Sequence, residues 1–204
     1  MAANAGLGTF VYLLDRFRGV FQAHLEHGWA NTRFHSPLLF LATLFSGLEL
    51  SEAASEARLA ALRLSNDESR VILAAMRFHR LPLELHAQAP LDSRSVYRYW
   101  RKTEASGLDG CLLAAAYYLH QHQHQLSVPA WTAFLQTLGA LLDGYGPYKA
   151  LVPLVRGDDL MQALGLAPGR QIGELLEALR EAQAVGEVST VEDALGWARA
   201  RVQP

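Results

Sequence analysis

The sequence predicts an all-α fold, and three observations support that prediction. Apolar residues recur every three or four positions through almost the whole chain, which is the spacing of one helix face. No segment of useful length alternates apolar and polar residues in the manner of a half-buried strand. Residues that commonly begin or end helices separate the apolar segments. We therefore expect about ten helices and no sheet.

Four helices are expected in roughly the first 80 residues. Serine suits an N-cap because its hydroxyl accepts a hydrogen bond from a free backbone N–H, and proline suits a first turn. Glycine suits a helix end. In chain order the expected elements are residues 10–25 ending by Gly28, a second helix from Ser36-Pro37 to Phe45, a third from Ser51, and a fourth from the cap signal Ser65 to Glu68 onward, reaching His79.

The remaining helices follow the same pattern. The expected elements are residues 92–102, 107–125 and 128–142, a short helix after Arg156 that ends near Gly165, a helix after Pro168, and a last helix from Thr190 to about Val202. Gly144, Gly146 and Pro147 are expected to break the chain after the helix over 128–142. We therefore expect a domain boundary there, with one domain over residues 1–145 and a smaller one over residues 146–204.

Composition and charge limit the classes of function. The 204 residues are 50% hydrophobic and 19% charged, which leaves apolar surface for a partner. A net charge of −2 argues against a surface that binds nucleic acid everywhere. Residues 1–102 hold 12 basic and 9 acidic residues, whereas residues 103–204 hold 6 and 11. A phosphate-binding surface is therefore expected in the first half.

Cysteine content and hydropathy exclude several further classes. Cys111 is the single cysteine, so the chain has no internal disulfide and no thiolate zinc cluster. The longest apolar stretch, residues 37–48, is too short to span a bilayer. No basic flank with a hydrophobic run and cleavage site begins the chain. We expect no membrane association and a cytoplasmic location.

Eight histidines raise the question of a metal site. His120 and His124 share one helix face at a spacing that suits a metal, but an exposed polar helix end is the preferred interpretation. His79 lies in a basic helix end, where capping of the last carbonyls is preferred over a phosphate or metal site. His24 and His27 also lie near a helix end, and we expect them only to favour the helix dipole.

The clearest candidate for RNA contact is a basic stripe on the helix over residues 92–102. Arg94, Arg98, Arg101 and Lys102 lie on one face, with aromatic residues beside them. Arginines next to aromatics suit RNA phosphates and stacked bases, and the alternative is a solvated face above an aromatic core. Arg170 follows a glycine-rich turn into a helix, which suits a phosphate or simply a helix connector.

Several segments resemble the tRNA nucleotidyltransferase / poly(A) polymerase family. The similarity extends over roughly residues 36–202 and is most specific in the C-terminal segments. The segments that resemble the family are residues 63–68 and 77–82, residues 93–101, residues 154–161 and 165–176, and residues 186–194. The resemblance implies an HD-like helical bundle over residues 1–145 and a C-terminal helical tail of the family type over residues 146–204.

The chain departs from that family at its catalytic positions. Family members with an HD domain have a His-Asp pair in a leucine-rich helix, and the corresponding residues 44–48 contain neither a histidine nor an aspartate. The later family aspartate would fall near residues 115–118 and is also missing. His79 alone remains of the implied metal set, and one imidazole is a poor site. The nucleotidyltransferase head is expected to be missing too.

Three hypotheses follow. The first is a non-catalytic tRNA- or other RNA-binding scaffold that needs no cofactor, contacts RNA through the basic stripe and Arg170, and works with a separate nucleotidyltransferase head or as a homodimer. The second is a protein–protein or dimerisation module without RNA function. The third is a residual HD-type metal phosphohydrolase that uses His79 with His120 or His124.

Overall fold

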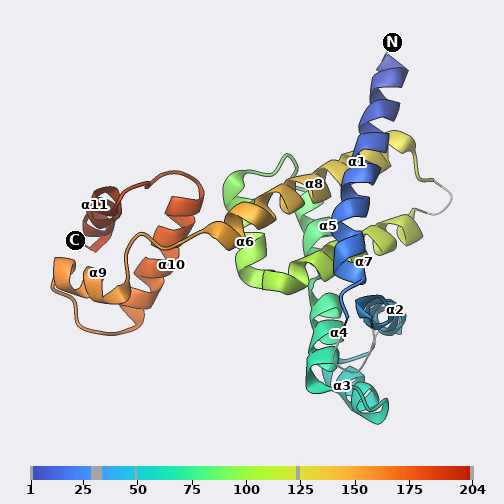
Figure 1. The fold of residues 1–204 in the computed structure, drawn as a ribbon, viewed down its shortest axis with the longest axis horizontal. Coiled ribbons are helices and arrows are strands. Elements are labelled where there is room, and N and C mark those ends of the chain that lie inside the picture. Colours follow the sequence, from blue (N-terminus) through green and yellow to red (C-terminus); the bar gives the residue numbers. More distant parts are fainter. Residues whose placement is uncertain (1, 29–33, 49, 123–124, 203–204) are drawn as a thin grey trace. The chain divides into compact units, whose positions relative to one another are not determined.

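The computed structural model describes residues 2–28, 34–48, 50–122 and 125–202. Across these four segments the regular elements are helices, apart from an isolated bridge between Gly28 and Phe34, so the all-α prediction is confirmed (Figure 1). Among the helices of this described part, none is long and apolar enough to cross a membrane.

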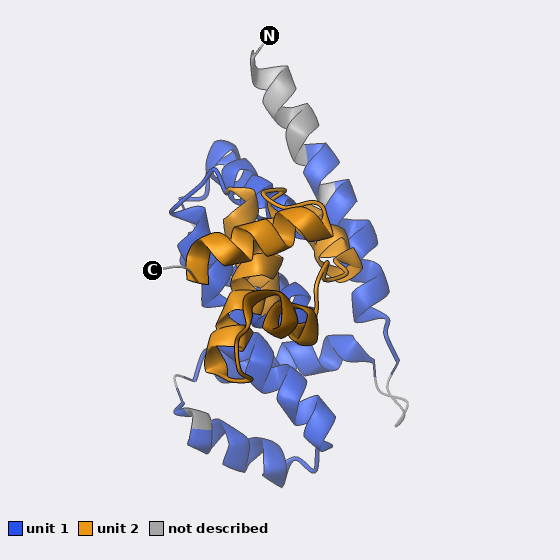
Figure 2. Ribbon diagram, turned by 90° about the vertical axis from the view of Figure 1, so that its left-hand side faces the viewer, with its two compact units in different colours: residues 1–91, 102–142 blue, residues 92–101, 143–204 orange. Residues whose placement is uncertain are grey.

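The chain forms two compact units that are not consecutive in sequence (Figure 2). Unit 1 contains residues 1–91 and 102–142, and unit 2 contains residues 92–101 and 143–204. Two helices therefore contribute to both units, namely α6 (Ser93–Thr103) and α8 (Val128–Ala150). The expected division into an HD-like domain over residues 1–145 and a tail domain over residues 146–204 stays a prediction.

Unit 1 is built around α4 (Asn66–Phe78), which packs against α2 (His35–Ser46) and α7 (Gly107–Gln121). Its other elements are α1 (Ala2–Leu25), α3 (Glu52–Ala61), α5 (Arg80–His86), the 3-10 helix η1 (Glu104–Ser106) and the first part of α8. One core cluster joins α2, α3, α4 and α7 through fully or almost fully buried Leu38, Ala42, Leu59, Ile72, Ala75 and Leu113.

Local capping predictions in unit 1 are mostly confirmed. The Ser51 hydroxyl accepts a hydrogen bond from the N–H of Ala54. Ser65 and Glu68 form a reciprocal capping box at the start of α4. The prediction that Ser36 caps the next helix is wrong, because α2 begins at His35 and its first N–H donates to the backbone carbonyl of His27 at 3.0 Å.

Unit 2 is assembled from α6, the end of α8, α9 (Gly157–Leu164), α10 (Arg170–Ala184) and α11 (Val191–Val202). Its core cluster includes Val155, Leu160, Ile172, Leu179, Val188 and Ala194. Gly165 ends α9 with φ of 66°, as its place in the sequence predicted. Thr190 caps α11 by accepting a hydrogen bond from the N–H of Asp193.

The predicted break at Gly144, Gly146 and Pro147 is wrong, because α8 continues through all three to Ala150. Gly144 instead serves close packing between α8 and α6. A Cβ atom built on Gly144 would lie 2.1 Å from Cγ1 of Val96 and 3.6 Å from the ring of Trp100. The absence of a side chain therefore lets the two helices approach, rather than ending one of them.

Candidate functional site

Three of the predicted RNA-contacting residues form a row of ion pairs within unit 2. Arg98 donates to both carboxylate oxygens of Glu181, from Nε at 2.8 Å and from Nη2 at 2.7 Å. Arg101 donates to both oxygens of Glu177, from Nε at 2.6 Å and from Nη2 at 3.0 Å. Both acceptors are on α10, so this arginine row connects α6 to α10.

Arg94 completes the row at the first turn of α6. Its Nη1 donates to Glu181 at 2.8 Å, and its Nη2 donates to Glu187. Glu181 thus accepts hydrogen bonds from two arginines. The hydrogen bond from Arg98 contributes most to lowering the pKa of Glu181 below its usual value, and the bond from Arg94 adds to this effect. Glu181 in turn raises the pKa of Arg98. Both partners therefore stay charged across the neutral range.

The aromatic residues of α6 are buried rather than exposed beside the arginines. Trp100 is fully buried and lies 4.4 Å, ring centre to ring centre, from Tyr145. Tyr97 and Tyr99 are 5% and 3% exposed, and burial raises the pKa of Tyr97 to about 12. Because their ring faces are covered, these residues are not placed to stack on bases. The aromatic part of α6 is a core stripe, which is the alternative that the sequence left open.

Lys102 and Arg170 lie outside this row. Lys102 is exposed near the end of α6. Arg170 is the first residue of α10, with a side chain 92% exposed, and its Nε donates to Glu174 at 2.6 Å. Among the five predicted contact residues, Arg94, Arg98 and Arg101 are thus brought together.

Of the histidines singled out as weak metal candidates, His79 and His120 belong to no group of three or more metal-ligand side chains within the described residues. His79 is 7% exposed; its Nδ1 lies 2.6 Å from the carbonyl oxygen of Met76, and burial lowers its pKa. That bond to the last turn of α4 matches the capping interpretation. His120 is exposed on α7. His124 lies outside the described residues.

A different set of metal-ligand side chains comes together in unit 1. Nε2 of His24 and Nε2 of His35 lie 2.5 Å and 2.7 Å from the same atom, Oδ1 of Asp109. The two imidazole rings are 4.4 Å apart, centre to centre, and inclined by 61°. Over the residues that the structure describes, this His24–His35–Asp109 cluster is the one group of three or more such ligands.

Helix ends position the cluster. His24 is in the last turn of α1, His35 is the first residue of α2, and Asp109 is in the first turn of α7, where the helix dipole favours an anion. Asp109 is 2% exposed and His35 4%. Burial acts to raise the pKa of Asp109, but the hydrogen bonds with His24 and His35 outweigh it, and the pKa lies below its usual value.

Sequence reasoning missed this cluster because Asp109 is 85 residues from His24 and 74 residues from His35 along the chain. The sequence predicts only a favourable interaction with the helix dipole for His24 and His27, and it gives no role to Asp109. The one local signal was a carboxylate in an otherwise apolar segment, residues 107–114. A charged residue in such a segment needs a buried partner, but the sequence does not identify it.

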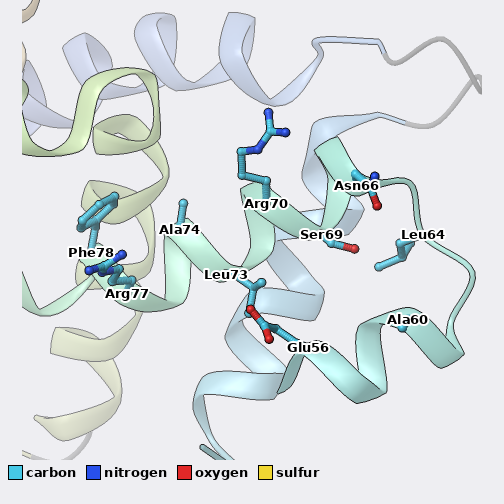
Figure 3. A pocket seen from close by; sticks show the side chains of 10 residues that line it. All are labelled: Glu56, Ala60, Leu64, Asn66, Ser69, Arg70, Leu73, Ala74, Arg77 and Phe78. Carbon is cyan, nitrogen blue, oxygen red and sulfur yellow. The ribbon is translucent and has the colours of Figure 1, made fainter. Parts of the chain in front are cut away.

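Unit 1 also contains an open hollow of about 600 Å³ between α3 and α4 (Figure 3). It is lined on α4 by Ser69, Leu73 and Arg77, and on α3 by Glu56. Figure 3 shows Arg70 extending away from the α3 side of α4, and its Nη1 lies 3.0 Å from Oδ1 of Asp67. The lining mixes apolar side chains with polar and charged ones.

Comparison with known proteins identifies relatives of the chain. Residues 33–198 match the family model described as tRNA nucleotidyltransferase domain 2. The CC-adding tRNA nucleotidyltransferase of Geobacter sulfurreducens is 58% identical over 41 residues, and the A-adding tRNA nucleotidyltransferase of Deinococcus radiodurans is 52% identical over 42 residues. The CC-adding tRNA nucleotidyltransferase of Thermus thermophilus is 50% identical over 42 residues.

These alignments are short. They cover 20%, 21% and 21% of this chain and 10% of each relative's length. No significant match to a solved structure was found.

Proposed function

The chain belongs to the tRNA nucleotidyltransferase family, and from that premise we propose that it binds tRNA as a non-catalytic helical body. The proposed contacts are Arg94, Arg98, Arg101 and Lys102 on α6 and Arg170 at the start of α10. The observation that supports this most is the arginine row, because it spaces three guanidinium groups along one helix of the family-matched region.

The ion pairs have two opposing effects on RNA binding. They hold the arginine side chains in fixed positions, so less side-chain entropy is lost when a phosphate is bound. They also place carboxylates beside the arginines, and these repel phosphate. The side chains of Arg94, Arg98 and Arg101 remain 37%, 64% and 41% exposed, which leaves part of each available to a partner. A moderate, salt-sensitive affinity is therefore expected.

A titration of labelled tRNA with the purified chain at several salt concentrations tests the proposal. Replacing Arg98 and Arg101 together by glutamine is expected to weaken binding and to reduce the salt slope by roughly one unit for each lost phosphate contact. The matched control is Arg70→Gln, which removes an exposed, ion-paired arginine from α4. Wild-type protein without salt-sensitive tRNA binding would refute the proposal.

The acidic partners separate an RNA-contacting role from a purely structural one. If the arginines contact phosphate, replacing Glu177 and Glu181 by glutamine removes the competing negative charge and tightens tRNA binding. If the arginines only fasten α6 to α10, the same change destabilises unit 2 and leaves RNA affinity unchanged or weaker. Circular dichroism of each variant confirms that the fold is retained before affinities are compared.

The non-catalytic part of the proposal is supported by the sequence, in which no histidine is directly followed by aspartate. It is tested by incubating the full chain with simple phosphoesters and divalent metal ions, and no turnover is expected. Metal-dependent hydrolysis that His79→Gln abolishes would favour the residual phosphohydrolase instead.

A second function, self-association, is favoured by one observation on α2. Phe40 and Leu44, one helical turn apart, are 77% and 60% exposed. Large apolar side chains on one helix face suit a second copy of this chain as partner. Light scattering decides between the two functions, because a stable oligomer that has no tRNA affinity would select self-association.

A further inference from the structure

We propose that His24, His35 and Asp109 of unit 1 bind one divalent transition-metal ion of the zinc class. This inference is independent of RNA binding, because it rests on a different unit and on different residues. It also differs from the His-Asp pair that the family resemblance implied, since the three ligands come from three separate helices and none is adjacent to another in sequence.

The donor atoms suit this class of metal. Two imidazole nitrogens and one carboxylate oxygen form a set that zinc accepts, whereas calcium and magnesium prefer oxygen alone. The three ligand atoms all lie within 4.8 Å of one another. Metal–ligand bonds of about 2.0–2.2 Å in a tetrahedral site separate donor atoms by about 3.3–3.6 Å. The present separations of 2.5 Å and 2.7 Å between Oδ1 and the two Nε2 atoms therefore need only a small side-chain movement.

The charge of the cluster also favours a cation. Asp109 is buried, and the groups that offset its charge are the two imidazoles. When both imidazoles are neutral, a buried negative charge remains, which is costly in a protein interior. A divalent ion balances that charge directly. The proton that each neutral imidazole holds at Nε2 toward Oδ1 moves to the other ring nitrogen, so that Nε2 offers its lone pair to the ion. An imidazolium or a protonated carboxyl group cannot ligate in this way. Binding therefore competes with protons and should weaken as the pH falls.

The position of the ligands gives the metal a structural consequence. The three ligands lie at the end of α1, at the start of α2 and in the first turn of α7, so one ion would tie these helices together. The helices hold the ligands close before binding, which reduces the cost of assembling the site. Three protein ligands leave a fourth coordination position for solvent, and the side chain of His24, at 18% exposed, is the most accessible of the three.

The test measures metal binding by the purified full chain after treatment with a chelator and dialysis. Calorimetry with Zn²⁺ is expected to give one site per chain. Co²⁺ is expected to give a d–d absorption band that Zn²⁺ abolishes. Thermal unfolding should shift to higher temperature with Zn²⁺, because the ion binds the folded state.

Two variants and one control make the test specific. His24→Gln should lower Zn²⁺ affinity at least tenfold and remove the thermal shift. Because the His24 side chain is 18% exposed, this variant should keep the fold. Asp109→Asn should have the same effect on metal binding. His120→Gln removes an exposed histidine from α7 and should bind Zn²⁺ as the wild type does. Wild-type protein without a Zn²⁺ site, or equal affinity in folded His24→Gln, would overturn the proposal.

Discussion

Replacement of Gly144 by alanine should destabilise unit 2, although alanine is the better helix former. The new Cβ would lie 2.1 Å from Cγ1 of Val96, far inside van der Waals contact. Val96 is β-branched and stiff at χ1, so it cannot move away without cost. Overpacking of this kind costs about 1–3 kcal/mol, and the helix propensity of alanine returns about 1 kcal/mol. Because the contact is so short, the overpacking cost should lie at about 2–3 kcal/mol. The net loss of stability should therefore be about 1–2 kcal/mol.

Urea unfolding measures this loss, followed by fluorescence because Trp100 packs beside Gly144. The matched control is Gly173→Ala in α10, where an added Cβ meets nothing within 4 Å. That change should stabilise the protein by about 0.5–1 kcal/mol. The two glycine substitutions are thus expected to have opposite signs within the same unit.

A double-mutant cycle tests the stated cause. In a Val96→Ala background the clashing Cγ1 is gone, so adding Gly144→Ala should become neutral or stabilising. The coupling free energy should be about 1–2 kcal/mol in favour of the double variant. A Gly144→Ala protein as stable as the wild type would refute the close-packing explanation of this glycine, and so would the absence of coupling.

Three further predictions concern charges and caps. The pKa of Glu181 is held below its usual value of 4.5, chiefly by the hydrogen bond from Arg98. The ion pairs of Glu181 therefore stabilise unit 2 fully above pH 4.5, and this stabilisation is lost as the pH falls through the pKa of the folded state. Urea unfolding between neutral and acid pH should show the loss, and Glu181→Gln should make the stability depend less on pH. Ser65→Ala removes one half of the capping box that involves buried Glu68 and should cost about 1 kcal/mol, as measured by urea unfolding. Thr190→Ala removes the cap of α11 and should lower the free energy of unfolding by about 1 kcal/mol, again measured by urea unfolding.

Features set by neighbouring residues could be predicted from the sequence. Ser51, Ser65, Gly165 and Thr190 act at the helix ends where their types are favoured, because capping involves residues only three or four positions away. The helical class follows from the same short range, since apolar spacing is a local property.

Features set by distant residues could not be predicted. Gly144 looked like a helix breaker because its reason for being glycine, Val96, lies on another helix. The start of α2 was misplaced because the carbonyl of His27 substitutes for a side-chain cap. The His24–His35–Asp109 cluster was missed because only the packing of three helix ends brings the ligands together.

The arginine row could be located from the sequence, but its ion pairs could not be predicted. The sequence identified the basic stripe on α6 and an acidic excess over residues 103–204, but not that the arginines of the stripe pair with glutamates of α10. The pairing neutralises the stripe locally, although the side chains of Arg94, Arg98 and Arg101 stay partly exposed. It also changes what a loss of RNA binding would mean, because an arginine variant alters both the contact to phosphate and the attachment of α6 to α10. Only the glutamate variants separate these roles. When Glu177 and Glu181 are neutralised, phosphate contact by the arginines predicts tighter tRNA binding, whereas helix attachment alone predicts binding that is unchanged or weaker.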